Sequence, residues 1–119
     1  MFLSYQQRIL KEILKNYRFS GQEILFDGGY GDGSFSRLLL RHVRMVVGID
    51  IDFNPIWNIR HEKCQFLIAD VCSLPFRDRV FDISLEKDML HYVKDPEKTL
   101  REIIRVTSEK GYSNSCRGK

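Results

Sequence analysis

The sequence lacks several features that would assign it to a specialised class of protein. No apolar run approaches the roughly 18 residues that a membrane span requires. Residues 1–8 show no basic leader followed by a long apolar segment, so a signal peptide is not expected. The three cysteines have no CxxC spacing and no neighbouring cluster of histidines, which favours reduced thiols over a disulfide framework or a metal site. We therefore expect a cytoplasmic protein with no membrane partner and no metal.

Charge of one sign is also lacking. The 19 Lys and Arg residues are interspersed with 16 Asp and Glu residues, which gives a net charge of +3. This balance neither requires nor excludes a nucleic-acid partner, so nucleic acid is not indicated. Internal repeats and low-complexity stretches are absent as well. The 119 residues suffice for one domain, which would bury roughly two-thirds of its unfolded surface.

The most informative stretch is residues 24–35, where an apolar run gives way to closely spaced glycines and then to a helical pattern. We interpret it as a strand, a tight turn and a helix. Gly29, Gly31 and Gly33 can take positive φ values and let a ligand approach the backbone, because glycine has no Cβ. Asp27 ends the strand with a carboxylate, which suits a ligand that carries hydroxyl or ammonium donors.

Helical and strand-like patterns alternate along the chain. Apolar residues at helical spacing predict an amphipathic helix within residues 2–18, and a second helix follows the glycines. Asn54-Pro55 and Asp95-Pro96 are typical helix starts, which predicts a short helix near residue 57 and a last helix through Ile104. Continuous apolar runs predict buried strands at residues 23–26, 45–49, 65–69 and 80–85. The expected fold is α/β: a Rossmann-like open, mostly parallel sheet with helices on both faces.

Acidic residues stand at the end of every predicted strand. They are Asp27, Asp50, Asp70 and Glu86. Because right-handed crossovers put the carboxyl ends of parallel strands on one edge, these four side chains are expected to line a single rim. Ligands of open α/β sheets bind at such a rim, at the point where the strand order reverses. The sequence therefore predicts a ligand site with four carboxylates.

A dinucleotide-binding dehydrogenase is one alternative for the glycine turn. It requires the pattern G-x-G-x-x-G, and with Gly29 and Gly31 as the first pair Ser34 stands where the third glycine should be. Asp50 would serve a ribose in either class of protein, so it does not discriminate between them. The glycine spacing disfavours NAD, which is kept as a third alternative.

Five segments in order resemble the class I S-adenosylmethionine-dependent methyltransferase family. They match its D-x-G-x-G-x-G turn, its second-strand motif, its third motif with an L-P-F loop, and two later segments. In this sequence the matches lie at residues 27–33, 47–50, 69–76 with 81–82, 90–93 and 102–106. The resemblance covers the N-terminal half to two-thirds of the family's fold. It implies S-adenosylmethionine as cofactor and S-adenosylhomocysteine as product.

The resemblance also implies a role for each matching residue. The backbone at Gly29 and Gly31 would pass under the methionine part of the cofactor, with Asp27 near its ammonium group. Asp50 would accept hydrogen bonds from both ribose hydroxyls, which a carboxylate can do without a proton of its own. Glu86 would face the methionine end.

The adenine ring would be held by residues that follow the second and third strands. Asp70 would accept a hydrogen bond from the adenine amino group, the Val71 amide would donate to the ring, and Ile51 would pack against the base. Each strand-end carboxylate has a simpler alternative: it could cap a nearby helix or turn, or stay solvated in a loop.

No catalytic residue can be assigned from the sequence. The leaving group in methyl transfer from a sulfonium is neutral, so positioning of the two reactants does most of the work. A general base is needed only if the methyl acceptor arrives protonated, and the nearest candidates along the chain are Glu86, Asp88 and His91. The acceptor itself stays unidentified.

The family-like pattern ends near residue 112. We expect residues 1–112 to form one S-adenosylmethionine-binding domain and residues 113–119 to form a polar, disordered tail. The chain would then be C-terminally truncated relative to the seven-stranded methyltransferase fold. The fourth strand would have an uncovered edge through which copies could self-associate. The expected function is methyl transfer, and the alternative is a truncated or non-catalytic module that binds S-adenosylmethionine or S-adenosylhomocysteine.

Overall fold

The computed structural model describes residues 4–28, 33–50, 61–86 and 89–108. Four strands form one sheet in the order β3-β2-β1-β4, and every pairing in it is parallel. The predicted α/β fold with a Rossmann-like parallel sheet is confirmed. The elements, in chain order, are α1 (Tyr5–Asn16), β1 (Ile24–Asp27), α2 (Ser34–Leu39), β2 (Met45–Asp50), β3 (Cys64–Ile68), β4 (Ile83–Leu85), the 3-10 helix η2 (Met89–His91) and α3 (Pro96–Val106).

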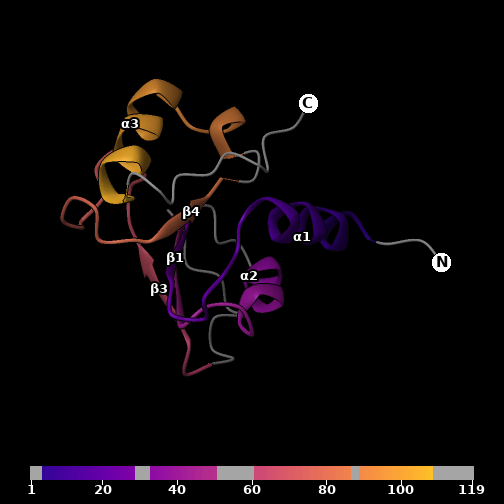
Figure 1. The fold of residues 1–119 in the computed structure, drawn as a ribbon. Coiled ribbons are helices and arrows are strands. Elements are labelled where there is room, and N and C mark those ends of the chain that lie inside the picture. Colours follow the sequence, from indigo (N-terminus) through magenta and orange to yellow (C-terminus); the bar gives the residue numbers. More distant parts are fainter. Residues whose placement is uncertain (1–3, 29–32, 51–60, 87–88, 109–119) are drawn as a thin grey trace.

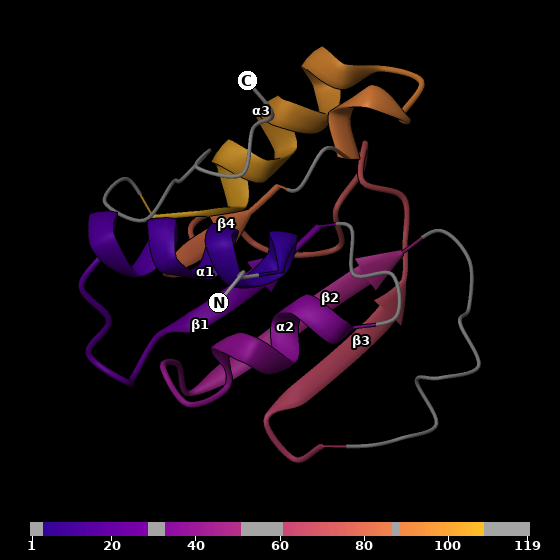
Figure 2. The same cartoon turned by 90° about the vertical axis from the view of Figure 1, so that its right-hand side faces the viewer.

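Helices lie on both faces of the sheet, as predicted. Figures 1 and 2 show α1 and α2 on one face and α3 on the other. Each face has its own apolar core, because neighbouring strand residues point to opposite sides. The buried residues on the α1 and α2 side are Ile13, Leu25, Phe35, Leu39, Val43, Val46, Ile83 and Leu85. Those on the α3 side are Phe26, Ile49, Leu74, Phe81, Ile103 and Val106.

The helix starts follow local chemistry. Ser4 caps α1 in a capping box, in which its side chain accepts from the Gln7 amide while the Gln7 side chain accepts from the Ser4 amide. Asp95 caps α3 by accepting from the Lys98 amide at 3.0 Å, which confirms the predicted start of the last helix. Gly33 precedes α2 with φ +78°, a backbone conformation that favours glycine.

The fourth strand is shorter than predicted. Residue 80 is exposed, and Phe81 makes an isolated parallel bridge to Thr107 instead of extending β4. The Phe81 amide donates to Val106 O at 2.9 Å and its carbonyl accepts from the Ser108 amide at 2.8 Å. The outer edge of β4 is therefore covered at Phe81, which corrects the expectation of a fully uncovered edge. The short helix predicted near residue 57 and the predicted tail at 113–119 lie outside the described residues.

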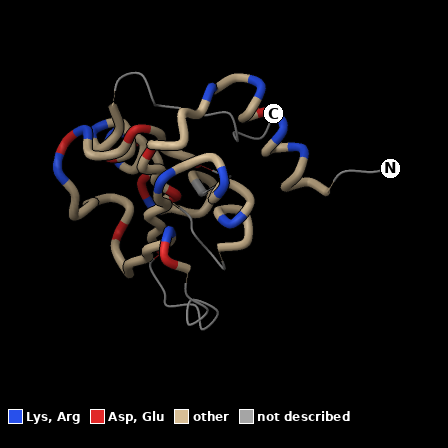
Figure 3. The backbone as a smooth tube through the Cα atoms, turned by 60° about the horizontal axis from the view of Figure 1, so that its bottom comes forward, with Lys and Arg blue, Asp and Glu red and all other residues tan. Residues whose placement is uncertain are grey.

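The described segments were also compared with the requirements of a membrane span and of a metal site. Within them, no helix has the length and apolar character needed to cross a membrane. Among the same residues there is no group of three or more His, Cys, Asp or Glu side chains that could hold a metal ion. Cys64 and Cys72, the two cysteines of the described segments, form no disulfide with each other. Figure 3 shows Lys and Arg spread over several elements among Asp and Glu.

Candidate functional site

The carboxyl ends of the four strands meet at one edge of the sheet. In register, Asp27 on β1 lies opposite Leu85 on β4, and Asp50 on β2 lies opposite Ile68 on β3. Parallel strands place these ends side by side, so the predicted rim of acidic residues exists. The two remaining acidic residues at this edge, just after β3 and β4, are Asp70 and Glu86.

Asp27 is the most deeply placed of these acids. It has no exposed surface, and one of its oxygens, Oδ2, accepts a 2.6 Å hydrogen bond from the Ser36 hydroxyl. Ser36 is fully buried as well and lies on α2, just beyond the glycine turn. A buried carboxylate needs such partners, because an uncompensated buried charge is costly. The serine therefore helps to hold the Asp27 carboxylate at the end of β1.

Glu86 is the second buried acid of the rim, with 4% of its surface exposed. Within the described residues its carboxylate accepts one hydrogen bond, from the Leu90 amide at 3.3 Å. A carboxylate can accept several hydrogen bonds, so Glu86 has capacity for a donor from a ligand. Asp27 and Glu86 together make the rim suitable for a ligand group that carries hydrogen-bond donors or positive charge.

Asp50 and Asp70 lie closer to solvent. Asp50 is half-buried, whereas Asp70 is exposed. Asp70 caps a turn: its Oδ1 accepts from the Cys72 amide at 2.8 Å and its carbonyl accepts from the Ser73 amide at 3.0 Å. The turn-capping alternative for Asp70 is therefore realised. This cap uses Oδ1 of Asp70. In the described part of the chain, no protein group donates to the second carboxylate oxygen, Oδ2.

The remaining predicted residues are only partly described. Gly29, Gly31, Ile51 and the candidate base Asp88 lie outside the described residues. Val71 is half-buried and packs against the core on the α3 side. The second candidate base, His91, is exposed on η2, where its ring meets the Tyr92 ring edge-on at 6.5 Å.

The N-terminus of α1 contacts the N-terminus of α2. Gln6 in the first turn of α1 donates from Nε2 to the Ser34 hydroxyl at 3.0 Å, and Ser34 is the first residue of α2. This contact joins segments that are far apart in sequence and brings α1 next to the carboxyl edge of β1. The helix thus forms one side of the candidate site.

The loop between β3 and β4 is attached to α3 by charged side chains. Arg105 on α3 donates to Glu102, and this hydrogen bond, assisted by one from the Leu74 amide, lowers the pKa of the Glu102 carboxyl. The same contact with Glu102 and a second one with Asp78 raise the pKa of Arg105. Both side chains therefore stay charged at neutral pH, and the attachment persists.

Another ionic cluster stands at the opposite edge, where β1 begins. Burial raises the pKa of Glu23, but hydrogen bonds from Ser20 and Gly21 outweigh this effect, so the net shift is downward. Burial also raises the pKa of Tyr17, and the negative charges of Glu23 and Asp82 raise it further. This cluster organises the turn before β1 and lies away from the rim.

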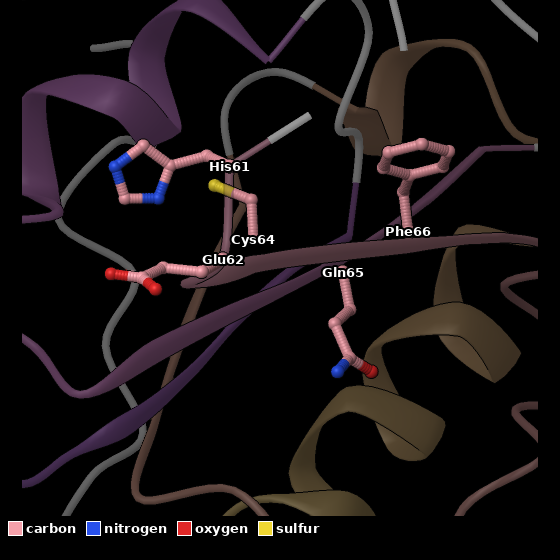
Figure 4. Close-up of a pocket in the computed structure, with 5 residues that line it drawn as sticks. All are labelled: His61, Glu62, Cys64, Gln65 and Phe66. Atoms are coloured by element: carbon pink, nitrogen blue, oxygen red, sulfur yellow. The ribbon is translucent and has the colours of Figure 1, made fainter. Parts of the chain in front are cut away.

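A cavity of about 540 Å³ opens at the other end of β3 from Asp70. Figure 4 shows Cys64 and Phe66 on one face of the strand and Gln65 on the other. Among the described residues, none of those predicted to bind the cofactor lines this cavity. The lining residues are His61, Glu62, Cys64, Gln65 and Phe66.

Sequence reasoning missed the residues that support the rim. Ser36 lies nine positions after Asp27, in the first turn of α2. The strand, turn and helix pattern of residues 24–35 could therefore have indicated that Ser36 lies close to Asp27. Glu102 and Arg105 belong to a segment that resembles the family, but nothing in their spacing shows that they bond to a loop about 30 residues earlier. Such contacts depend on how α3 packs.

The chain is similar to known methyltransferases. A family model described as a methyltransferase domain matches residues 26–113. The malonyl-[acyl-carrier protein] O-methyltransferase of Erwinia billingiae is 30% identical over 109 residues, covering 88% of this chain and 43% of that protein. The norajmaline N-methyltransferase of Rauvolfia serpentina is 40% identical over 47 residues, covering 40% of this chain and 16% of that protein.

A solved structure supports the same fold. The YcgJ protein of Bacillus subtilis superposes on this chain with a TM-score of 0.78 at 24% identity, covering 88% of this chain and 48% of that one. At this identity the likeness concerns the fold alone. The chain spans about half the length of that structure and less than half of the two curated relatives.

Proposed function

The chain belongs to the class I S-adenosylmethionine-dependent methyltransferase family, and from this premise we propose that it transfers a methyl group from S-adenosylmethionine to an acceptor not yet identified. The observation that carries the proposal is the rim of four acidic residues at the ends of four adjacent parallel strands. Two of these acids, Asp27 and Glu86, are buried. Buried carboxylates fit a ligand that carries an ammonium group and hydroxyls.

Each residue of the rim would have a separate task. Asp27 would receive the ammonium group, and Glu86 would lie at the same end of the cofactor. Asp50 would accept hydrogen bonds from the two ribose hydroxyls, and the second carboxylate oxygen of Asp70 would accept one from the adenine amino group. The Val71 amide, the backbone at Gly29 and Gly31, and the side chain of Ile51 would complete the pocket.

The cofactor supplies a methyl group on a positively charged sulfur, and the protein holds the cofactor and the acceptor in the orientation that the transfer requires. Its leaving group is neutral, so the chain needs no oxyanion site and no metal at the reacting atoms. The first turn of α1, which touches α2 through Gln6, would help to bind the acceptor. The names of the two curated relatives specify an oxygen and a nitrogen acceptor, so similarity does not select the acceptor class.

Calorimetric titration of S-adenosylhomocysteine tests the proposal. The wild-type protein should bind, and Asp50→Ala should bind at least about tenfold more weakly because it loses hydrogen bonds to a charged acceptor. Glu97→Gln is the matched control, since it removes an exposed acid on α3 away from the rim. Absence of binding by the wild-type protein would refute the proposal, and competition by NAD would favour a dehydrogenase.

A non-catalytic module that binds the same ligand is the second candidate, since the buried acids Asp27 and Glu86 would serve ligand binding without catalysis equally well. It predicts S-adenosylhomocysteine binding without transfer of labelled methyl groups to small-molecule, lipid, protein or RNA acceptors. Transfer to any of these pools would favour the enzyme. The two candidates share the rim and differ only in whether an acceptor site accompanies it.

Besides a methyl acceptor, the sequence indicates a second copy of the same chain as a partner. In the described part of the chain, Ile83–Leu85 pairs with β1 on one side, and its other side has no described strand partner beyond the bridge at Phe81. We propose that a second copy covers this edge. Light scattering at increasing concentration should give a mass above that of one chain, and a constant monomer mass would contradict the proposal.

A further inference from the structure

Arg105 joins α3 to the loop between β3 and β4 through five hydrogen bonds. Two go to backbone carbonyls, those of Leu74 at 3.1 Å and Phe76 at 2.9 Å. Three go to carboxylates: two to Glu102 at 2.7 and 3.1 Å and one to Asp78 at 2.8 Å. These bonds connect Arg105 to four residues, Leu74, Phe76, Asp78 and Glu102. One guanidinium thus contacts both the helix and three positions of the loop.

Leu74 is held to α3 by both of its backbone polar groups. Its carbonyl accepts from Arg105, and its amide donates to Glu102 Oε1 at 2.8 Å. Its side chain is 5% exposed and belongs to the core that Ile103 and Val106 of α3 help to form. Position 74 is therefore fixed relative to the helix.

The turn that contains Asp70 ends just before this fixed point. The Cys72 amide donates to Asp70 Oδ1 at 2.8 Å, and the Ser73 amide donates to the Asp70 carbonyl at 3.0 Å. The Cys72 sulfur also lies 3.2 Å from the hydroxyl of Thr99 on α3. The Asp70 carboxylate is thus bonded to Cys72, which contacts α3, and the Asp70 carbonyl is bonded to Ser73, which immediately precedes the fixed Leu74.

We infer that Arg105 is a positioning residue for the cofactor: by fixing the loop on α3, it sets the place from which Asp70 meets the adenine amino group. This inference rests on the proposed function. Arg105 would never touch the ligand, since it acts through Leu74 and the Asp70 turn. The role requires an arginine, because a planar guanidinium offers five donors in a fixed fork, whereas a lysine ammonium offers three on a flexible stem.

Arg105→Lys tests the inference because it keeps the charge and removes the fork. Calorimetry should show about tenfold weaker binding of S-adenosylhomocysteine, which corresponds to about 1.4 kcal/mol. Arg101→Lys is the matched control, since Arg101 lies one turn earlier on α3 in a pair with Glu97 that is about three-quarters exposed. The control should bind within twofold of the wild-type protein.

Double variants separate positioning from a general loss of structure. If Arg105 acts through Asp70, then Arg105→Lys should weaken binding less than twofold in an Asp70→Asn background. In an Asp50→Asn background Arg105→Lys should still weaken binding about tenfold, because Asp50 is the last residue of β2 and does not belong to the loop. Equal effects in both backgrounds would show that the arginine acts on the whole protein, and would overturn the inference.

A readout without ligand completes the test. In the wild-type protein the Leu74 amide should exchange slowly with solvent, and Arg105→Lys should speed its exchange at least tenfold while leaving the Phe26 amide unchanged. If Arg105→Lys loses its cooperative unfolding transition, Glu102→Gln serves instead, with about threefold weaker binding expected. Failure of the wild-type protein to bind overturns the proposed function as well, whereas normal binding by Arg105→Lys overturns this inference alone.

Discussion

The hydrogen bond between Ser36 and Asp27 stabilises the fold and also holds a residue of the candidate site in place. Both side chains have no exposed surface, and the bond is 2.6 Å long. Ser36→Ala removes the donor and leaves the buried carboxylate with one partner fewer. A hydrogen bond to a charged group contributes about 1.5–3 kcal/mol, so we expect the variant to lose about 2 kcal/mol of unfolding free energy.

Thermal unfolding followed by circular dichroism measures this loss. For a domain of this size, 2 kcal/mol corresponds to a fall in Tm of about 6–12 °C. Ser73→Ala is the control, because Ser73 is exposed in the β3–β4 loop and its replacement should change the unfolding free energy by less than about 0.5 kcal/mol. S-adenosylhomocysteine should raise the Tm of Ser36→Ala less than that of the wild-type protein, since the Asp27 carboxylate is held less firmly.

A double-mutant cycle shows whether the two residues act as a pair. In an Asp27→Asn background the partner of Ser36 is no longer charged, so Ser36→Ala should cost clearly less than in the wild-type protein. The reasoning is refuted if Ser36→Ala unfolds within 0.5 kcal/mol of the wild-type protein, or if its cost is the same in both backgrounds.

Three further outcomes are expected. The pKa of Glu102 lies below its ordinary value of 4.5 because Arg105 donates to it, so its contribution to stability is present above pH 4.5 and is lost as the pH falls through the folded-state pKa. Urea unfolding between pH 7 and 3 should show this loss, and Glu102→Gln should flatten it. Phe26→Ala should cost about 3–5 kcal/mol by chemical denaturation, because the ring is fully buried and stacks on Phe81 at 4.8 Å. Ser4→Ala should cost about 1 kcal/mol in thermal unfolding, because it removes the capping box of α1.

The sequence was sufficient to predict the order of the elements. Strands covered by helices on both faces are rich in apolar residues, and the predicted strands agree with β1 to β4 to within three residues. The predicted burial is wrong for β3, because this strand lies at the edge of the sheet and none of its residues is buried. The start of α3 was predicted because Asp95 and Pro96 carry the cap and the fixed φ that a helix start requires. Such signals are local, so they can be read without knowledge of packing.

The length of β4 could not be predicted in the same way. Residues 80–85 include four apolar side chains, but Phe81 pairs with Thr107 and the Asp82 carboxylate accepts from the Ile24 amide at 2.8 Å. These partners come from the segment after α3 and from β1. A strand ends where its neighbours stop offering hydrogen bonds, and that is decided by tertiary structure.

The acidic rim shows why a strand-end carboxylate is compatible with more than one role. Capping a turn and binding a ligand were alternatives for Asp70, yet the cap occupies only Oδ1, through the Cys72 amide. The cap also restrains the side chain, so a ligand that met the other oxygen would find an acceptor already fixed by the turn. Restraint of this kind reduces the entropy lost on binding. At Asp70, therefore, the structural role supports the proposed binding role, and the same holds at Asp27, where Ser36 supplies the restraint.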